Sequence, residues 1–147
     1  MTKIKSIINP VKMREDVSFS DNDLDTAWMD QSSKAASYGV MHAKAEHQES
    51  AAKNNLAIVG ASIANELREY YSSEGIKVSE SRLEAEVIID SRYQSAFKDW
   101  NDSKLISGLG RAANEALRQR RDMIVQASKK ALDEKSYKAA LSQKPTS

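Results

Sequence analysis

An apolar pattern with helical spacing runs without a break from Leu24 to Tyr70, and it limits this chain to a small set of folds. Its members follow steps of 3 and 4 residues, so they share one face of a helix about 75 Å long. A single apolar face of that length needs other helices packed along it. The seam consists of Leu24, Trp28, Ala35, Tyr38, Ala45, Ala52, Leu56, Val59, Ile63 and Tyr70.

Both ends of this helix carry recognisable signals. Ser20–Asp23 is a cluster of residues that favour N-caps, and it immediately precedes the seam. Glu66–Glu80 contains the breakers that end the helix, with Gly75 after a serine pair. Ser79 offers a hydroxyl that can cap the next helix. The sequence therefore predicts a long helical hairpin with its elbow at 66–80.

After the elbow, the pattern predicts a short helix over 79–89 and a long helix from Arg92 to about Glu134. Asn101–Ser103 contains neither Pro nor Gly, so we expect the long helix to continue through it. Two rows of this helix lie on nearly opposite sides. One row is aromatic and the other is apolar, so we expect the helix to pass from one packing neighbour to another. The rows are Tyr93, Phe97 and Trp100, and then Leu105, Leu109, Ala112, Ala116, Met123 and Ala127.

The composition of the core predicts self-association. The chain has only two Phe and two Trp, and much of its apolar content is Ala, so one copy would have a thin core. We therefore expect an all-α protein whose hairpins assemble into helical bundles in a homo-oligomer. Residues 1–19 show no helical period and predict an extended N-terminal arm or a short edge strand. Residues 20–135 form the helical domain, and residues 136–147 are expected to be a basic, flexible tail.

The residue types do not favour catalysis, a cofactor or a metal site. The chain has no Cys, no nucleophile motif and no glycine-rich phosphate loop. The one group of possible metal ligands lacks the spacing of a complete shell. It consists of His42, Glu46, His47 and Glu49. No apolar run approaches the length of a membrane span, so we expect a cytoplasmic protein without a membrane partner.

Positive charge is concentrated in the last third of the chain. Residues 101–147 hold 10 basic and 5 acidic side chains, whereas residues 1–100 hold 12 and 16. Four of these cations, Lys104, Arg111, Arg118 and Lys129, share one helix face with Arg121 beside them. A phosphate backbone could follow such a row. The alternative is a solvated face, because Glu115 and Asp122 are spaced to form ion pairs with it.

Arg120 falls inside the apolar row of the same helix. A buried guanidinium needs a carboxylate or carbonyl partner. We therefore expect Arg120 to make a subunit contact.

The segment Leu67–Ser72, Leu-Arg-Glu-Tyr-Tyr-Ser, with Gly75 after it, resembles the Tyr-Tyr segment of the UvsY-like phage recombination mediators. A fainter likeness continues through the long helix from Gly110 to Met123. The resemblance implies a helical, ring-forming homo-oligomer in the cytoplasm of an infected bacterial host. It also implies binding to single-stranded DNA and to two protein partners, a phage recombinase and a single-strand-binding protein.

Two classes of function follow from these observations. The first is a non-enzymatic recombination mediator that assists recombinase loading onto strands coated by single-strand-binding protein. The second is a helical, self-assembling phage structural or scaffold protein that binds no nucleic acid. The positions of the Lys and Arg that precede the Tyr pair in the family are occupied here by Asn65 and Leu67. The candidate nucleic-acid contacts therefore lie elsewhere. They are Arg68, Lys77, Lys104, Arg111, Arg118, Arg121 and Lys129.

Overall fold

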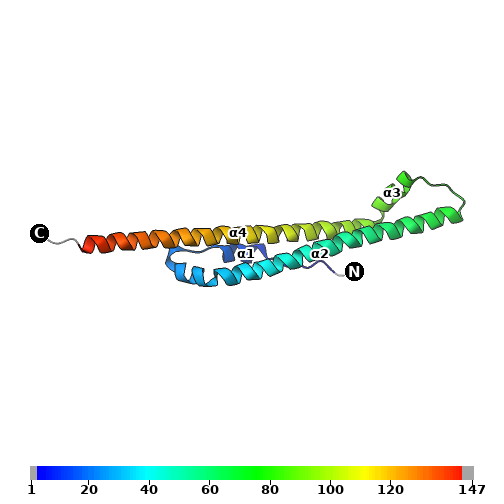
Figure 1. The fold of residues 1–147 in the computed structure, drawn as a ribbon. Coiled ribbons are helices and arrows are strands. Elements are labelled where there is room, and N and C mark those ends of the chain that lie inside the picture. The colour runs from blue at the N-terminus through cyan, green and yellow to red at the C-terminus, as the bar shows by residue number, and fades with distance from the viewer. Residues whose placement is uncertain (1–2, 144–147) are drawn as a thin grey trace. The chain divides into compact units, whose positions relative to one another are not determined.

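A computed structural model describes residues 3–143 of the chain, and all regular structure in that range is helical. The helices are α1 (Pro10–Val17), α2 (Leu24–Ser73), α3 (Glu80–Ile89) and α4 (Ser91–Ser142), with a short 3-10 turn at Asp21–Asp23 before α2 (Figure 1). The chain divides into two compact units. Unit 1 takes the chain up to Ile7 together with His42–Leu109, and unit 2 takes Ile8–Met41 together with the chain from Gly110 onward.

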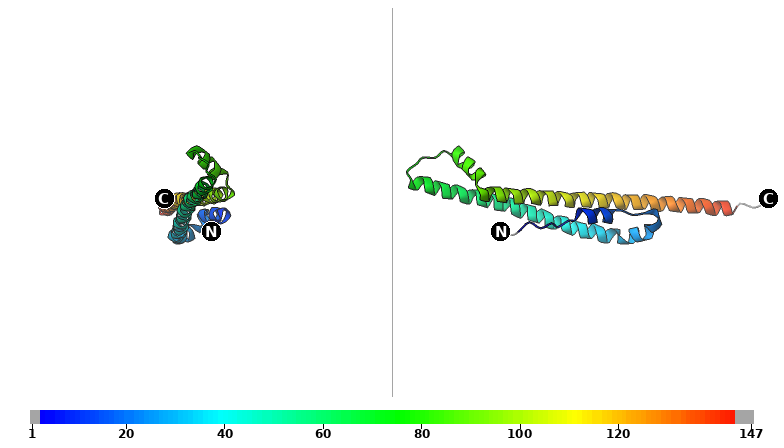
Figure 2. Two further views of the ribbon diagram at one scale, coloured as in Figure 1. Left: turned by 90° about the vertical axis from the view of Figure 1, so that its right-hand side faces the viewer. Right: turned by 180° about the vertical axis from the view of Figure 1, so that it is seen from behind.

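Unit 2 contains a helix that the sequence analysis did not predict. We expected an extended arm over 1–19, but Pro10–Val17 is α1, which lies against the segments of α2 and α4 in this unit (Figure 2). The Asn9 side chain caps α1 by accepting hydrogen bonds from the N–H groups of Val11 and Lys12. Pro10 is therefore the first residue of a helix, a position where its missing N–H costs nothing.

Unit 1 contains the elbow, and here the predicted signals are confirmed. α2 ends at Ser73, and Gly75 has a φ of 68°, a left-handed conformation that favours glycine. Ser79 caps α3 by accepting a hydrogen bond from the N–H of Arg82. At the other end of the unit, the Gln48 amide clamps the arm. It accepts from the Lys5 N–H at 2.8 Å and donates to the Lys5 carbonyl at 3.1 Å.

Much of the apolar seam of α2 is buried within a single chain. Tyr38 in unit 2, and Leu56 and Ile63 in unit 1, are buried without any second copy. Within each unit, the segments of α2 and α4 lie side by side (Figures 1 and 2). Of the other large seam residues, Leu24 and Val59 are half-buried. Trp28 and Tyr70 are exposed, and so is the small seam residue Ala35, so a single chain leaves these three seam positions uncovered.

The buried face of α4 is different from the predicted one. We expected the row from Leu105 to Ala127 to face a packing neighbour, but Leu105 is 67% exposed and Met123 is also exposed. The side chains that are buried lie on another face and include many small ones. In unit 1 they are Ala96, Ser103, Ile106 and Ser107, and in unit 2 they are Ala113, Leu117, Arg120 and Ile124. Small residues let two helix backbones approach closely, and a count of large apolar residues does not detect them.

α4 also extends beyond the predicted end. Residues 136–142 continue the helix rather than forming a separate tail. The predicted flexibility of residues 144–147 lies outside the described part of the chain. Every residue from Lys129 to Gln143 is exposed. The predicted end near Glu134 was therefore too early. The sequence has no proline that would stop the helix there, since the next one is Pro145.

The buried Tyr38 predicts a loss of stability at alkaline pH. Its hydroxyl donates to Asp16 Oδ2 at 2.6 Å, which ties α1 to α2 in unit 2. Burial and this hydrogen bond raise the pKa of Tyr38 from 10.0 to about 12. Below pH 10 both the folded and the unfolded chain keep the phenol neutral, so its full contribution is present. Between pH 10 and 12 the unfolded chain loses the proton first, so stability falls as pH rises.

Tyr38→Phe should therefore unfold with a shallower pH dependence between 10 and 12, and should lose about 1 kcal/mol at neutral pH. Urea denaturation at a series of pH values measures both effects. Tyr137→Phe, at an exposed position on α4, is the matched control and should leave both unchanged. A Tyr38→Phe curve parallel to that of the parent would show that this phenol does not stabilise the fold.

Candidate nucleic-acid interface

In unit 2 the structure places four of the predicted cations on exposed turns of α4. Arg118 pairs with Glu115 at 3.0 Å, and Arg121 pairs with Asp122 at 3.1 Å. Arg111 and Lys129 make no ion pair with any residue in the range 3–143. The solvated, salt-bridged face that the sequence allowed is therefore present for half of this row. The other half keeps its charge available for an external anion.

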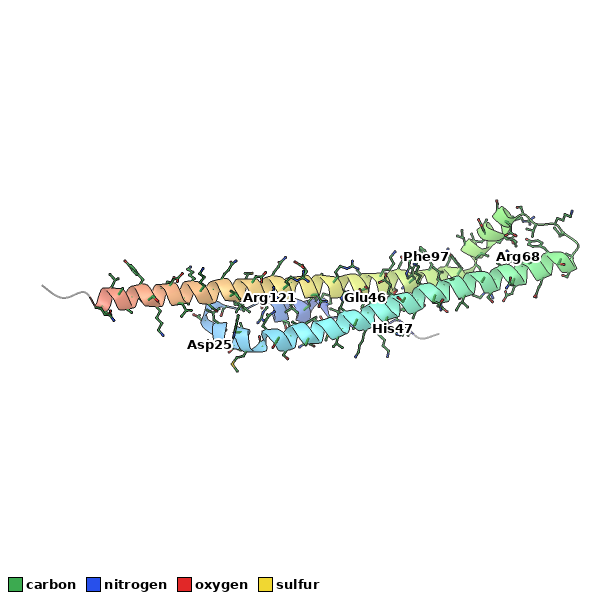
Figure 3. All side chains as sticks on the ribbon, viewed as in Figure 1. Asp25, Glu46, His47, Arg68, Phe97 and Arg121 are labelled. Atoms are coloured by element: carbon green, nitrogen blue, oxygen red, sulfur yellow. The ribbon has the colours of Figure 1, made fainter. Side chains whose placement is uncertain are left out.

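An open groove of about 360 Å³ lies beside these arginines in unit 2. Ala35 and Gly39 of α2 line this groove, together with Arg118 and Arg121 of α4. Arg121 is labelled in Figure 3. A Cβ added at Gly39 would meet no described atom within 4 Å, so the groove is unobstructed there. Spacing along the sequence does not reveal this groove, because it forms only where Ala35 and Gly39 of α2 come beside the cations of α4.

In unit 1, the predicted cation Lys104 contacts an aromatic ring. Its Nζ lies 4.3 Å from the centroid of the Trp100 ring, a cation–π contact between residues one helical turn apart. Phe97 packs edge-to-face against Trp100 with 6.0 Å between the ring centroids. The four-residue spacing of Trp100 and Lys104 in the sequence is a signal from which this contact could be predicted.

The elbow cations differ in their availability. Arg68 donates to Glu80 Oε2 at 3.1 Å and to Asn65 Oδ1 at 3.3 Å, so it connects α2 to the first turn of α3. Lys77 is exposed in the loop and has no ion pair within the described residues. Of the Tyr pair, Tyr71 is buried and donates to Glu86 at 2.6 Å, while Tyr70 is exposed beside it. Arg68 and Tyr71 therefore have structural partners, whereas Lys77 and Tyr70 face solvent.

Arg120 is not part of the exposed row. It is 3% exposed in unit 2 and donates to Asp30 Oδ1 at 3.1 Å, to Gln31 Oε1 and to the Ala27 carbonyl. The expected carboxylate and carbonyl partners are present, but they belong to α2 of the same chain, so no subunit contact is needed. Partial burial acts to raise the pKa of Asp30, but its hydrogen bonds to Arg120 and Lys34 outweigh this and lower the pKa overall.

A metal site, a membrane span and similarity to known proteins are the remaining sources of information about function. His42 Nε2 lies 3.3 Å from Glu46 Oε1, but no three potential metal ligands come together within residues 3–143. Among the helices described, none is long and apolar enough to cross a membrane. Comparisons of the chain with protein-family models, curated proteins and solved structures found no match.

Proposed function

We propose that this chain is a non-enzymatic, self-assembling recombination mediator that binds single-stranded DNA. The observation that carries the proposal is the cation row of α4 in unit 2. Arg111 and Lys129 lack ion pairs with described residues, and Arg118 and Arg121 border an open groove. Phosphate oxygens are suitable partners for such side chains, because each contact releases condensed counterions from the nucleic acid.

The proposed partners follow from the resemblance of Leu67–Ser72 to the mediator family. The protein would assist a phage recombinase to load onto strands coated by single-strand-binding protein. We propose a ring-like homo-oligomer as the acting form. The uncovered seam residues Trp28 and Tyr70, with Leu105 and Met123, would be available for contacts between copies.

A second candidate is a helical structural or scaffold protein that binds only itself. The observation that favours it is the amount of exposed apolar side chain, since Met29, Leu105 and Ile89 are each more than half exposed. This candidate predicts assembly without any nucleic-acid binding, so a DNA titration distinguishes the two.

The triple substitution Arg111→Ala, Arg118→Ala and Lys129→Ala tests the row. We expect the affinity for an oligothymidylate to fall at least ~10-fold at low salt, and the slope of log K against log[salt] to decrease by about 2, since each lost contact to a single strand contributes roughly 0.7. Fluorescence anisotropy of a labelled oligonucleotide measures both quantities.

A matched control removes the same charge from elsewhere. Lys12→Ala, Arg14→Ala and Lys53→Ala change three exposed cations outside the row, and this variant should keep most of the affinity and slope of the parent. If both triple variants weaken binding equally, only net charge matters and the row is not the interface. Arg68→Ala tests the elbow separately. It should change the affinity for single-stranded DNA only a little, because Arg68 already has Glu80 as its partner.

A further inference from the structure

Two aromatic rings of α4 in unit 1 lie beside the core rather than in it. The buried positions of α4 in this unit are Ala96, Ser103, Ile106 and Ser107. Phe97 and Trp100 pack edge-to-face with each other at an interplanar angle of 72°. Phe97 remains 39% exposed (Figure 3), and Trp100 is half-buried. The hairpin therefore leaves an aromatic pair accessible on the surface of unit 1.

Lys104 adds a cation to this pair. It is exposed, and its ammonium lies over the Trp100 ring rather than against a carboxylate, since it has no ion pair with a described residue. The neighbouring cation Lys98 is different, because it pairs with Asp102 at 2.6 Å. Lys104 is thus held next to a π face with its charge available to an anion.

We propose that Phe97, Trp100 and Lys104 form a base-stacking subsite for single-stranded nucleic acid, an inference that rests on the function proposed above. Lys104 contacts a phosphate, and the adjacent unpaired base stacks on the aromatic pair formed by Phe97 and Trp100. When the phosphate draws the ammonium outward, the face of Trp100 becomes open to the base. Stacking of this kind tolerates any sequence, because every base has a π face. It selects single strands, whose bases are not already paired and stacked.

The fluorescence of Trp100 provides a direct test. The chain has two Trp residues, so Trp28→Phe leaves Trp100 as the only one and keeps an aromatic ring at position 28, in unit 2. This variant is titrated at low salt with an oligothymidylate and with an abasic oligonucleotide of equal length. We expect both to bind and only the oligothymidylate to quench Trp100 strongly. Equal quenching by the two ligands, or binding of the oligothymidylate without quenching, would overturn the subsite.

Phe97→Leu provides a second test, the difference in affinity between the oligothymidylate and the abasic strand. Loss of a ring with a purely structural role would not change this difference. The substitution keeps an apolar side chain and removes the π face. The affinity for the oligothymidylate should fall roughly tenfold, while that for the abasic strand stays unchanged. Tyr137→Leu, which removes an exposed ring of α4 in unit 2, is the control and should affect neither ligand. An equal loss for both ligands, or no loss for either, would contradict stacking. If neither ligand binds the parent, the proposed function fails as well.

Discussion

Ile63→Asp should destabilise the protein by at least ~3 kcal/mol, because it places a carboxylate in an apolar contact with no partner. Ile63 is 2% exposed and belongs to the segment of α2 in unit 1. The charged form must either be desolvated or force the helices apart, and both alternatives disrupt the seam. Urea denaturation followed by circular dichroism should show a lower midpoint, or no folded baseline.

The matched control for this substitution is Ile58→Asp. Ile58 is on the same helix in the same unit but is 58% exposed, so its change should stay within about 0.5 kcal/mol. Equal effects of the two substitutions would show that helix propensity, and not burial, decides the result. A stable Ile63→Asp variant with an unchanged melt would contradict the assignment of this face to the interior.

Arg120→Ala is the second substitution with a large expected effect, a loss of about 3 kcal/mol. Truncation removes the guanidinium that satisfies Gln31, the Ala27 carbonyl and the carboxylate of Asp30. Arg118→Ala is the control, since its pair with Glu115 is exposed and should contribute less than ~1 kcal/mol. Chemical denaturation measures both.

Arg120→Met separates packing from charge in the same experiment. A flexible apolar side chain refills the volume without needing buried partners, so it should recover part of the stability lost in Arg120→Ala. An Arg120→Ala protein as stable as the parent would show that this network contributes nothing to folding. A Met variant less stable than the Ala variant would contradict the packing argument.

The ends of the helices around the elbow could be predicted from the sequence because they depend on local chemistry. Ser79 caps α3 and Gly75 terminates the preceding turn wherever these segments pack. α1 was missed for a local reason too. Residues 1–19 show no helical period, although Asn9 is a good N-cap and Pro10 follows it at the first helical position, where proline is favoured.

The face of α4 could not be predicted in the same way. Large apolar residues such as Leu105 formed the clearest row, but Ala113 and Ser107 are buried instead. Which face of a helix is buried depends on how closely its neighbour approaches, and small residues favour close approach. The exposed large residues of that row, Leu105 and Met123, are expected to meet other copies, a contact that one chain cannot display.

The candidate site was predicted in part. The pattern identified the cations of the row, and the structure distinguishes those with carboxylate partners from those without. Spacing alone could not separate Arg111 and Lys129 from Arg118, because each of the three has an acidic residue four positions further along the helix. The groove beside Ala35 and the contact of Lys104 with Trp100 required coordinates.

The mass of the assembly, with and without an oligothymidylate, tests the account most directly. Analytical ultracentrifugation at micromolar protein should give a whole-number multiple of the chain mass, greater than one. At low salt the DNA should sediment with that assembly, and at high salt it should separate while the protein stays assembled. A folded monomer, or an oligomer whose mass does not change with DNA at any salt concentration, would contradict the proposed mediator function.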